Sequence, residues 1–172
     1  DNDICKLKYA FRREDDTGTG IVTFTGSLSP ERWYHLVIYY ERGTVEAYID
    51  ASKTFSTDDG TNLDLSTSST WDLHIGARGP PYSSDWFLGY IDEIRIYNRR
   101  LTEEEISRNF WHPYDPVRNG LVLWLRQNEG FGSSVKDHSP EGNDGTLYGD
   151  YSWYSLDSPP WLRFFKIRLV PK

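Results

Sequence analysis

Residues 31–50 read ERWYHLVIYYERGTVEAYID and carry the pattern that decides the fold. In 33–40 both alternating sets of side chains are apolar or aromatic, which is typical of a strand covered on both faces. A short connection containing a glycine follows, and in 45–49 apolar side chains alternate with polar ones, as in a strand with one buried face. The stretch therefore predicts an antiparallel hairpin with a central strand.

The segments on either side extend this β pattern. Upstream, 4–13 and 21–25 flank an acidic turn containing a glycine, which predicts a second hairpin. Residues 51–69 are rich in Ser, Thr, Asp and Asn, so we expect a long surface loop there. Further strands are expected at 71–77, 87–98, 120–125, 145–148 and 161–170.

One helix is indicated, starting within LTEEEI at 101–106. Thr102 is placed to cap its first turn and Glu105 to complete a capping box. Pro113 and Pro116 keep the helix short. Many short strands with one capped helix predict an all-β protein, an antiparallel β-sandwich of jelly-roll type.

Composition limits the possible classes of protein. The chain has 172 residues, which predicts a single domain over 1–172, and its 16% aromatic content excludes intrinsic disorder. A net charge of −7 argues against a nucleic-acid partner, because such binding relies on clustered Lys and Arg. No apolar run is long enough to span a bilayer, so no membrane insertion is expected.

Two groups of segments carry a family resemblance. Residues 87–106, FLGYIDEIRIYNRRLTEEEI, follow the hairpin of 31–50 and the segment LHIG at 73–76 in the order strand, turn and capped helix. Further on come GLVLWL at 120–125 and DHSPEGNDGTLYG at 137–149. These segments resemble the laminin G-like members of the concanavalin A-like lectin and glucanase jelly-roll superfamily.

The resemblance is in inverted order. Residues 1–115 resemble the second half of the family domain, and 118–172 resemble its opening half followed by a C-terminal strand. A circular permutation explains this, because the opening and closing strands of the family domain are neighbours; strands shared between adjacent chains explain it equally well. The sequence departs from the family at Asp50 and Ala51, where a glycine normally follows the aspartate.

The resemblance also suggests a Ca²⁺ site. Alternation places Asp92 on the same face as Ile94 and Ile96, while Glu93 and Arg95 are expected to point to solvent. A carboxylate on an apolar face needs a partner, which is either a cation or hydrogen-bond donors from loop amides. We therefore take as candidate Ca²⁺ ligands Asp92, Asp137 and Asn143, and the alternative for the last two is an ordinary polar turn.

The candidates for sugar binding are aromatic residues beside proline-rich breaks, namely Tyr82, Trp86 and Trp111. The alternative is that these rings pack the interior. Catalysis is not expected, because Asp92 and Glu93 are adjacent, face opposite sides of a strand and cannot form the carboxylate pair of a glycosidase.

The C-terminal segment forms the last predicted strand. From residue 159 onward four basic residues meet no acidic one, whereas the whole chain is acidic. This strand either completes its own sheet or pairs with a neighbouring subunit, which would favour a filament. The candidate assembly residues are Trp161, Phe165, Lys166, Ile167, Arg168 and Leu169.

The predicted function is that of a non-enzymatic structural or adhesion module outside the cell, on a cell surface or on a virion. In its strongest form the chain self-associates into a pilus-like or virion-appendage filament. The alternative is a lectin module that binds surface glycans, and a glycoside hydrolase is the distant third.

Overall fold

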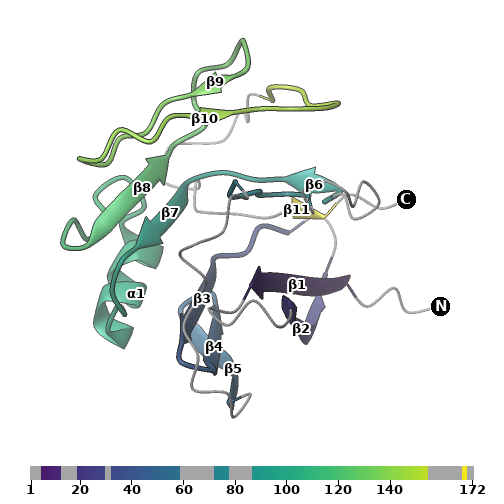
Figure 1. The fold of residues 1–172 in the computed structure, drawn as a ribbon, viewed down its shortest axis with the longest axis vertical. Helices are drawn as coiled ribbons and strands as arrows, with labels where there is room; N and C mark the ends of the chain where they lie inside the picture. The colour runs from purple at the N-terminus through teal and green to yellow at the C-terminus, as the bar shows by residue number, and fades with distance from the viewer. Residues whose placement is uncertain are drawn as a thin grey trace. The chain divides into compact units, whose positions relative to one another are not determined.

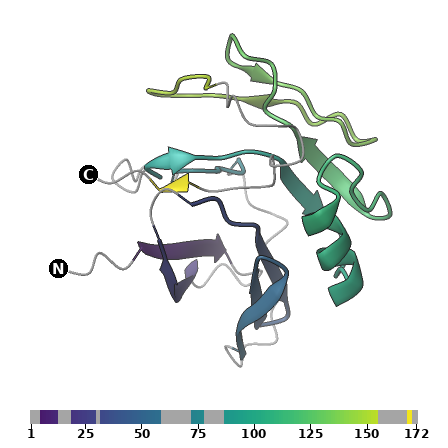
Figure 2. The same ribbon diagram turned by 180° about the vertical axis from the view of Figure 1, so that it is seen from behind.

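The computed structural model describes residues 5–12, 19–29, 32–58, 72–77, 87–154 and 168–169 (Figures 1 and 2). For 5–12, 19–27 and 168–169 it describes the backbone alone. The chain forms two compact units. The first comprises Asp1–Arg32, Val37–Gly89 and Arg168–Lys172, and the second comprises Trp33–Leu36 and Tyr90–Ile167.

The first unit holds the hairpins expected from the N-terminal half. One pairs β1 (Cys5–Arg12) with β2 (Thr19–Leu28) in antiparallel fashion. A second sheet has the order β3 (Leu36–Glu41), β4 (Thr44–Ile49) and β5 (Ser52–Asp58). Both predicted hairpins are thereby confirmed, but β3, which was expected to be the central strand, lies at the edge of the described sheet, and β4 is its central, buried strand. Val45 and Ala47 of β4 form the small core of this sheet with Ile38, Tyr40 and Phe55.

Strand β5 corrects the expectation of a loop for residues 52–58; the rest of the expected loop, 59–69, lies outside the described residues. The residues of β5 are polar and mostly exposed, and only Phe55 faces the core. Such an edge strand lacks the apolar alternation that marks a half-buried strand, so its composition resembles that of a loop. Pairing with β4, in which Ala47 lies opposite Phe55, stabilises it instead.

Both turns of this sheet use backbone conformations that favour glycine. The β3–β4 turn has positive φ at Arg42 and Gly43, as a type I′ turn requires. The β4–β5 turn has positive φ at Asp50 (51°) and at Ala51 (63°). Ala51 therefore occupies a left-handed conformation that costs an L-residue about 1 kcal/mol or more. The glycine that the family resemblance implies at this position would avoid that cost.

We expect Ala51→Gly to raise the free energy of unfolding by about 0.5–1 kcal/mol, because relief of the left-handed strain exceeds the added chain entropy of glycine. Urea unfolding measures the change. Ala47→Gly, on the neighbouring strand β4, is the control and should destabilise. A neutral or destabilising Ala51→Gly would contradict the strained turn.

The second unit contains the helix and the core of the C-terminal half. Strand β7 (Ile94–Tyr97) pairs antiparallel with β8 (Leu121–Leu125), and helix α1 (Glu103–Trp111) connects them. Figures 1 and 2 both show α1 beside this pair. The short strands β9 (Ser134–Val135) and β10 (Gly145–Thr146) form another antiparallel pair. The core cluster consists of Ile94, Leu123, Leu125 and Val135.

The β7–β8 pairing confirms that the closing and opening segments of the family resemblance are neighbours here. Ile94 lies opposite Leu125, and Ile96 lies opposite Leu123. The predicted strand at 120–125 is also confirmed, since β8 is buried on both faces. The single domain over 1–172 stays a prediction.

The expected strand at 87–98 is interrupted. It divides into β6 (Gly89–Tyr90) and β7, because Glu93 has a φ of 55° and breaks the extended backbone. The expected strand at 71–77 is wrong for its described residues, 72–77, where only a single bridge occurs, at Ala77. No helix in the described part of the chain has the length and apolarity needed to cross a membrane.

These elements are those of an all-β fold with one helix in the described residues, in agreement with the predicted class.

Candidate functional site

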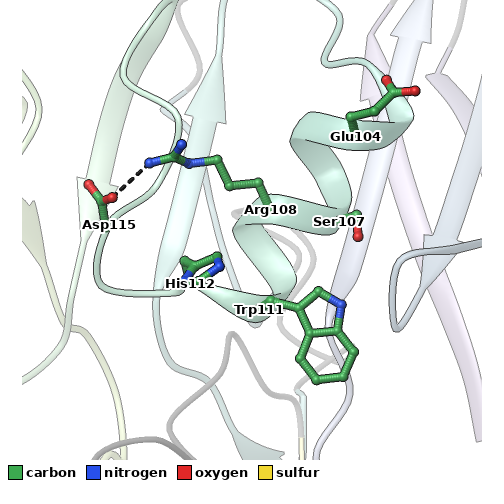
Figure 3. A pocket seen from close by; sticks show the side chains of 6 residues that line it. All are labelled: Glu104, Ser107, Arg108, Trp111, His112 and Asp115. Atoms are coloured by element: carbon green, nitrogen blue, oxygen red, sulfur yellow. Dashed lines mark hydrogen bonds and ion pairs between the residues drawn. The ribbon is translucent and has the colours of Figure 1, made fainter.

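A surface pocket of about 290 Å³ opens beside helix α1 (Figure 3). It is lined by Glu104, Ser107, Arg108, Trp111, His112 and Asp115. The helical period brings most of this lining together, because Glu104 and Arg108, and likewise Ser107 and Trp111, are four residues apart and share a face. The loop after the helix supplies the rest.

The sequence defines both ends of this helix. Thr102 Oγ1 accepts a hydrogen bond from Glu105 N (3.2 Å), and the Glu105 carboxylate accepts one from Thr102 N (3.0 Å). This is the predicted capping box, and it is confirmed. At the other end, His112 N donates to Arg108 O (2.8 Å), and the helix stops before Pro113.

A buried hydrogen-bond network fixes the loop that follows the helix. Asn109, on the inner face of α1, accepts from Val117 N (2.9 Å) and donates to Tyr97 Oη (3.0 Å). Tyr97 Oη in turn donates to Val117 O (3.0 Å), and Arg95 donates to Pro113 O. The loop is therefore tied at both ends to strand β7 and helix α1, and the pocket wall that it forms is preorganised.

Trp111 presents the largest apolar surface in the pocket. This residue is 64% exposed, although tryptophan is usually well buried. Phe110 supports it in an edge-on contact, with ring centroids 4.7 Å apart, and Phe110 also contacts His35 at 5.6 Å. Burial, and next the charge of Arg95, lower the pKa of His35 to about 4, so at neutral pH this support is an uncharged ring.

The polar groups of the pocket include one ion pair. Arg108 Nη2 lies 2.7 Å from Asp115 Oδ2, and both side chains are more than half exposed (Figure 3). Glu104 lies one turn earlier on the helix, where hydrogen bonds to its own backbone N–H and to the Thr102 side chain lower the pKa of its carboxyl. The pocket therefore combines an exposed indole with a paired guanidinium and carboxylate, a set suited to a polar ligand that has an apolar face.

Strands β7 and β8 and the residues next to them form a buried ionic cluster around Glu93. Glu93 is 2% exposed, and its carboxylate accepts hydrogen bonds from Arg95 Nη2 and from Trp124 Nε1 (2.8 Å). Arg126 Nε lies 3.6 Å from the other carboxylate oxygen. Burial raises the pKa of Glu93 despite these positive neighbours, and burial lowers the pKa of Arg95. Each of the buried charges of Glu93 and Arg95 is therefore stabilised by the other.

This cluster corrects the expected orientations in β7. Glu93 and Arg95 were expected to face solvent and Asp92 the interior; in the structure Glu93 and the Arg95 side chain are buried, and Asp92 is half-buried. The positive φ of Glu93 shifts the alternation between Tyr90 and Ile94, and Arg95 is buried because the Trp124 ring and the loop at Pro113 cover the face of β7 opposite Ile94. The Asp92 carboxylate accepts a hydrogen bond from Glu93 N (3.0 Å).

The other two candidate calcium ligands do meet. Asp137 is buried, and its carboxylate accepts hydrogen bonds from Trp124 N, Ser139 N, Ser139 Oγ and Asn143 N at 2.7–2.8 Å. Burial alone would raise the pKa of this carboxyl, but these donors lower it. No group of three His, Cys, Asp or Glu in the described residues is arranged to hold a metal ion. The Ca²⁺ site stays a prediction.

The remaining candidates divide between described and undescribed residues. Trp111 lines the pocket, whereas Tyr82 and Trp86 lie outside the described residues. Of the assembly candidates, Arg168 and Leu169 form β11 (Arg168–Leu169), which pairs with β6 of the same chain. The others lie outside the described residues: Trp161, Phe165, Lys166 and Ile167.

Sequence reasoning missed the polar half of the pocket. Spacing on the helix could have linked Glu104 and Arg108 to the face that carries Trp111. Asp115 had no such signal, because its place depends on how the loop folds back against Asn109 and Tyr97.

Comparison with known proteins identifies the family. The model of the concanavalin A-like lectin/glucanases superfamily matches residues 2–107, which is more than half of the chain. The protein therefore belongs to this superfamily, as the sequence resemblance predicted. The sequence matches no curated protein.

A solved structure with a similar fold comes from Bacteroides ovatus ATCC 8483 and is called a "putative carbohydrate binding protein". The TM-score is 0.65 and the sequence identity 25%, and the match covers 81% of this chain and 41% of that protein. The chain thus spans less than half the length of its structural relative.

Proposed function

We propose that this chain is a non-catalytic carbohydrate-binding module and that the pocket beside α1 holds the sugar. The observation that carries the proposal is Trp111, a largely exposed indole that lines the same pocket as a charged hydrogen-bonding pair. The fold family and the name of the Bacteroides ovatus protein support the same function.

The pocket offers both kinds of contact that a sugar needs. The C–H face of a pyranose ring stacks on Trp111, and its hydroxyl groups donate to the Asp115 carboxylate and accept from the Arg108 guanidinium. Little ordering is needed on binding, because Phe110 holds the indole and the Asn109 network holds the loop. This preorganisation favours measurable affinity in an open, shallow site.

Replacement of Trp111 by alanine is expected to weaken glycan binding by tenfold or more, because it removes the stacking surface and leaves the polar groups in place. A glycan array identifies a bound sugar, and isothermal titration calorimetry measures its affinity for parent and variant. Tyr148→Ala is the matched control, since Tyr148 is 84% exposed and lies outside the pocket lining.

Binding that survives in Trp111→Ala, or that is lost equally in Tyr148→Ala, would place the sugar elsewhere. Absence of binding to every glycan on the array would overturn the proposed function. The superfamily also includes glucanases, so the non-catalytic part of the proposal is checked by the release of reducing ends from the bound glycan, which we expect to be undetectable.

A glycan ligand favours a location outside the cell, on a cell surface or on a virion, and an adhesive role there. The filament form of the earlier prediction has less support, because β11 pairs with β6 within one chain. Size-exclusion chromatography and electron microscopy of the purified chain test self-association directly.

A further inference from the structure

We infer that the pocket selects neutral glycans over acidic ones and that Asp115 determines this selection, an inference that rests on the proposed function. The argument begins with the charges that face the ligand. The lining contains two carboxylates, of Glu104 and Asp115, and a single guanidinium, of Arg108. These three side chains together carry a net negative charge.

The guanidinium already has a carboxylate partner. Arg108 Nη2 is already 2.7 Å from Asp115 Oδ2, and Figure 3 shows the Arg108 side chain reaching from the helix toward Asp115 on the loop that follows it. Exposed pairs of this kind contribute little stability, so a ligand carboxylate could displace Asp115 at small cost. The ligand would then share the guanidinium with the Asp115 carboxylate, and the two like charges would repel each other at close range.

Glu104 adds to this effect. It forms no ion pair with any residue in the described part of the chain, and hydrogen bonds lower the pKa of its carboxyl, so it stays ionised. A uronate, sialylated or sulfated sugar is therefore repelled by the Glu104 carboxylate. It also competes with the Asp115 carboxylate for Arg108, the single guanidinium in the lining. A neutral sugar meets neither penalty, and its hydroxyl groups use both members of the Arg108–Asp115 pair without separating them.

The test compares matched ligands. Glucose-, galactose- and mannose-based oligosaccharides are each measured beside their C6-oxidised uronate forms, by calorimetry with the full chain. We expect the neutral form to bind about tenfold more tightly at low ionic strength, with a smaller ratio at high salt, because screening weakens the repulsion between exposed charges.

Asp115→Asn should abolish this preference. It releases Arg108 from its ion pair, while the asparagine side chain keeps similar size and hydrogen-bonding capacity. Uronate binding is expected to strengthen by about tenfold relative to neutral binding. Glu104→Gln is the matched control: it removes the same charge but keeps the Arg108–Asp115 pair, so we expect a change of only about twofold.

The outcomes separate this inference from the proposed function. A parent chain that prefers uronates, or an Asp115→Asn variant with an unchanged neutral-to-uronate ratio, overturns the inference and leaves carbohydrate binding in place. If neither ligand form binds, or if both bind Trp111→Ala as well as the parent, the proposed function fails and the inference fails with it. Since Asp115 is largely exposed, thermal unfolding should show that the variant folds like the parent.

Discussion

Replacing Glu93 with alanine is expected to lower the free energy of unfolding by about 3–5 kcal/mol, because it leaves the guanidinium of Arg95 buried without its carboxylate. Only 6% of the Arg95 side chain and 3% of the Glu93 side chain are exposed, so water cannot replace the lost partner. Trp124 Nε1 loses its acceptor in the same substitution. Urea unfolding followed by tryptophan fluorescence measures the effect.

Two further variants separate the loss of the Glu93 charge from the other effects of Glu93→Ala. Glu93→Gln keeps an acceptor for Trp124 and a similar volume, so its loss should be smaller than that of the alanine variant. Glu141→Ala removes an exposed carboxylate and should change stability by no more than about 0.5 kcal/mol. If Glu93→Ala falls within 1 kcal/mol of the parent, the ion pair is not the buried, interdependent pair that the structure shows.

The cluster around Glu93 also reaches the pocket. Arg95 Nη2 donates to both the Glu93 carboxylate and the Pro113 carbonyl, and Pro113 begins the loop that carries Asp115. A guanidinium with fixed positions for its donors holds that loop better than a flexible side chain would. The same buried charge pair thus contributes to stability and to the geometry of the candidate sugar site.

Local sequence signals were sufficient for the elements with a strong pattern. The apolar runs predicted β3 and β8, and the Thr102 capping box predicted the start of α1. In these segments propensity, hydrophobic pattern and tertiary packing favour the same structure, so sequence reasoning succeeds.

Other features depend on contacts between distant residues. Glu93 follows an apolar segment in a regular alternation, and nothing in its neighbourhood indicates a positive φ. That conformation is stabilised by Arg95 and Trp124, and Trp124 is 31 residues away. The polar edge strand β5 is likewise held by pairing with β4 and not by its own composition.

The candidate site was predictable only in part, for the same reason. Trp111 was recognised as an aromatic residue near a proline break, which is a local feature. Asp115 reaches Arg108 because Asn109 and Tyr97 hold the intervening loop, and that arrangement is a product of the tertiary fold.

Asp137→Ala is the second substitution for which we expect a large effect, a loss of about 3 kcal/mol in the free energy of unfolding. The carboxylate accepts from three backbone N–H groups and one hydroxyl, and alanine leaves these donors without an acceptor. The folded pKa of this carboxyl is lowered, so its contribution is complete above the ordinary pKa of aspartate and is lost as the pH falls through the folded value. Urea unfolding at pH 7 and at acidic pH measures both effects.

The controls distinguish a hydrogen-bonded carboxylate from a calcium ligand. Asp144→Ala removes a neighbouring exposed carboxylate that accepts from Asp137 N (2.9 Å), and we expect a loss of about 1 kcal/mol. Both oxygens of Asp137 already accept two hydrogen bonds each, so a chelator should leave the parent unchanged. The opposite result has two parts: a chelator lowers the stability of the parent, and the same chelator does not lower the stability of the Asp137→Ala variant. That result would show that the carboxylate acts through a bound cation instead.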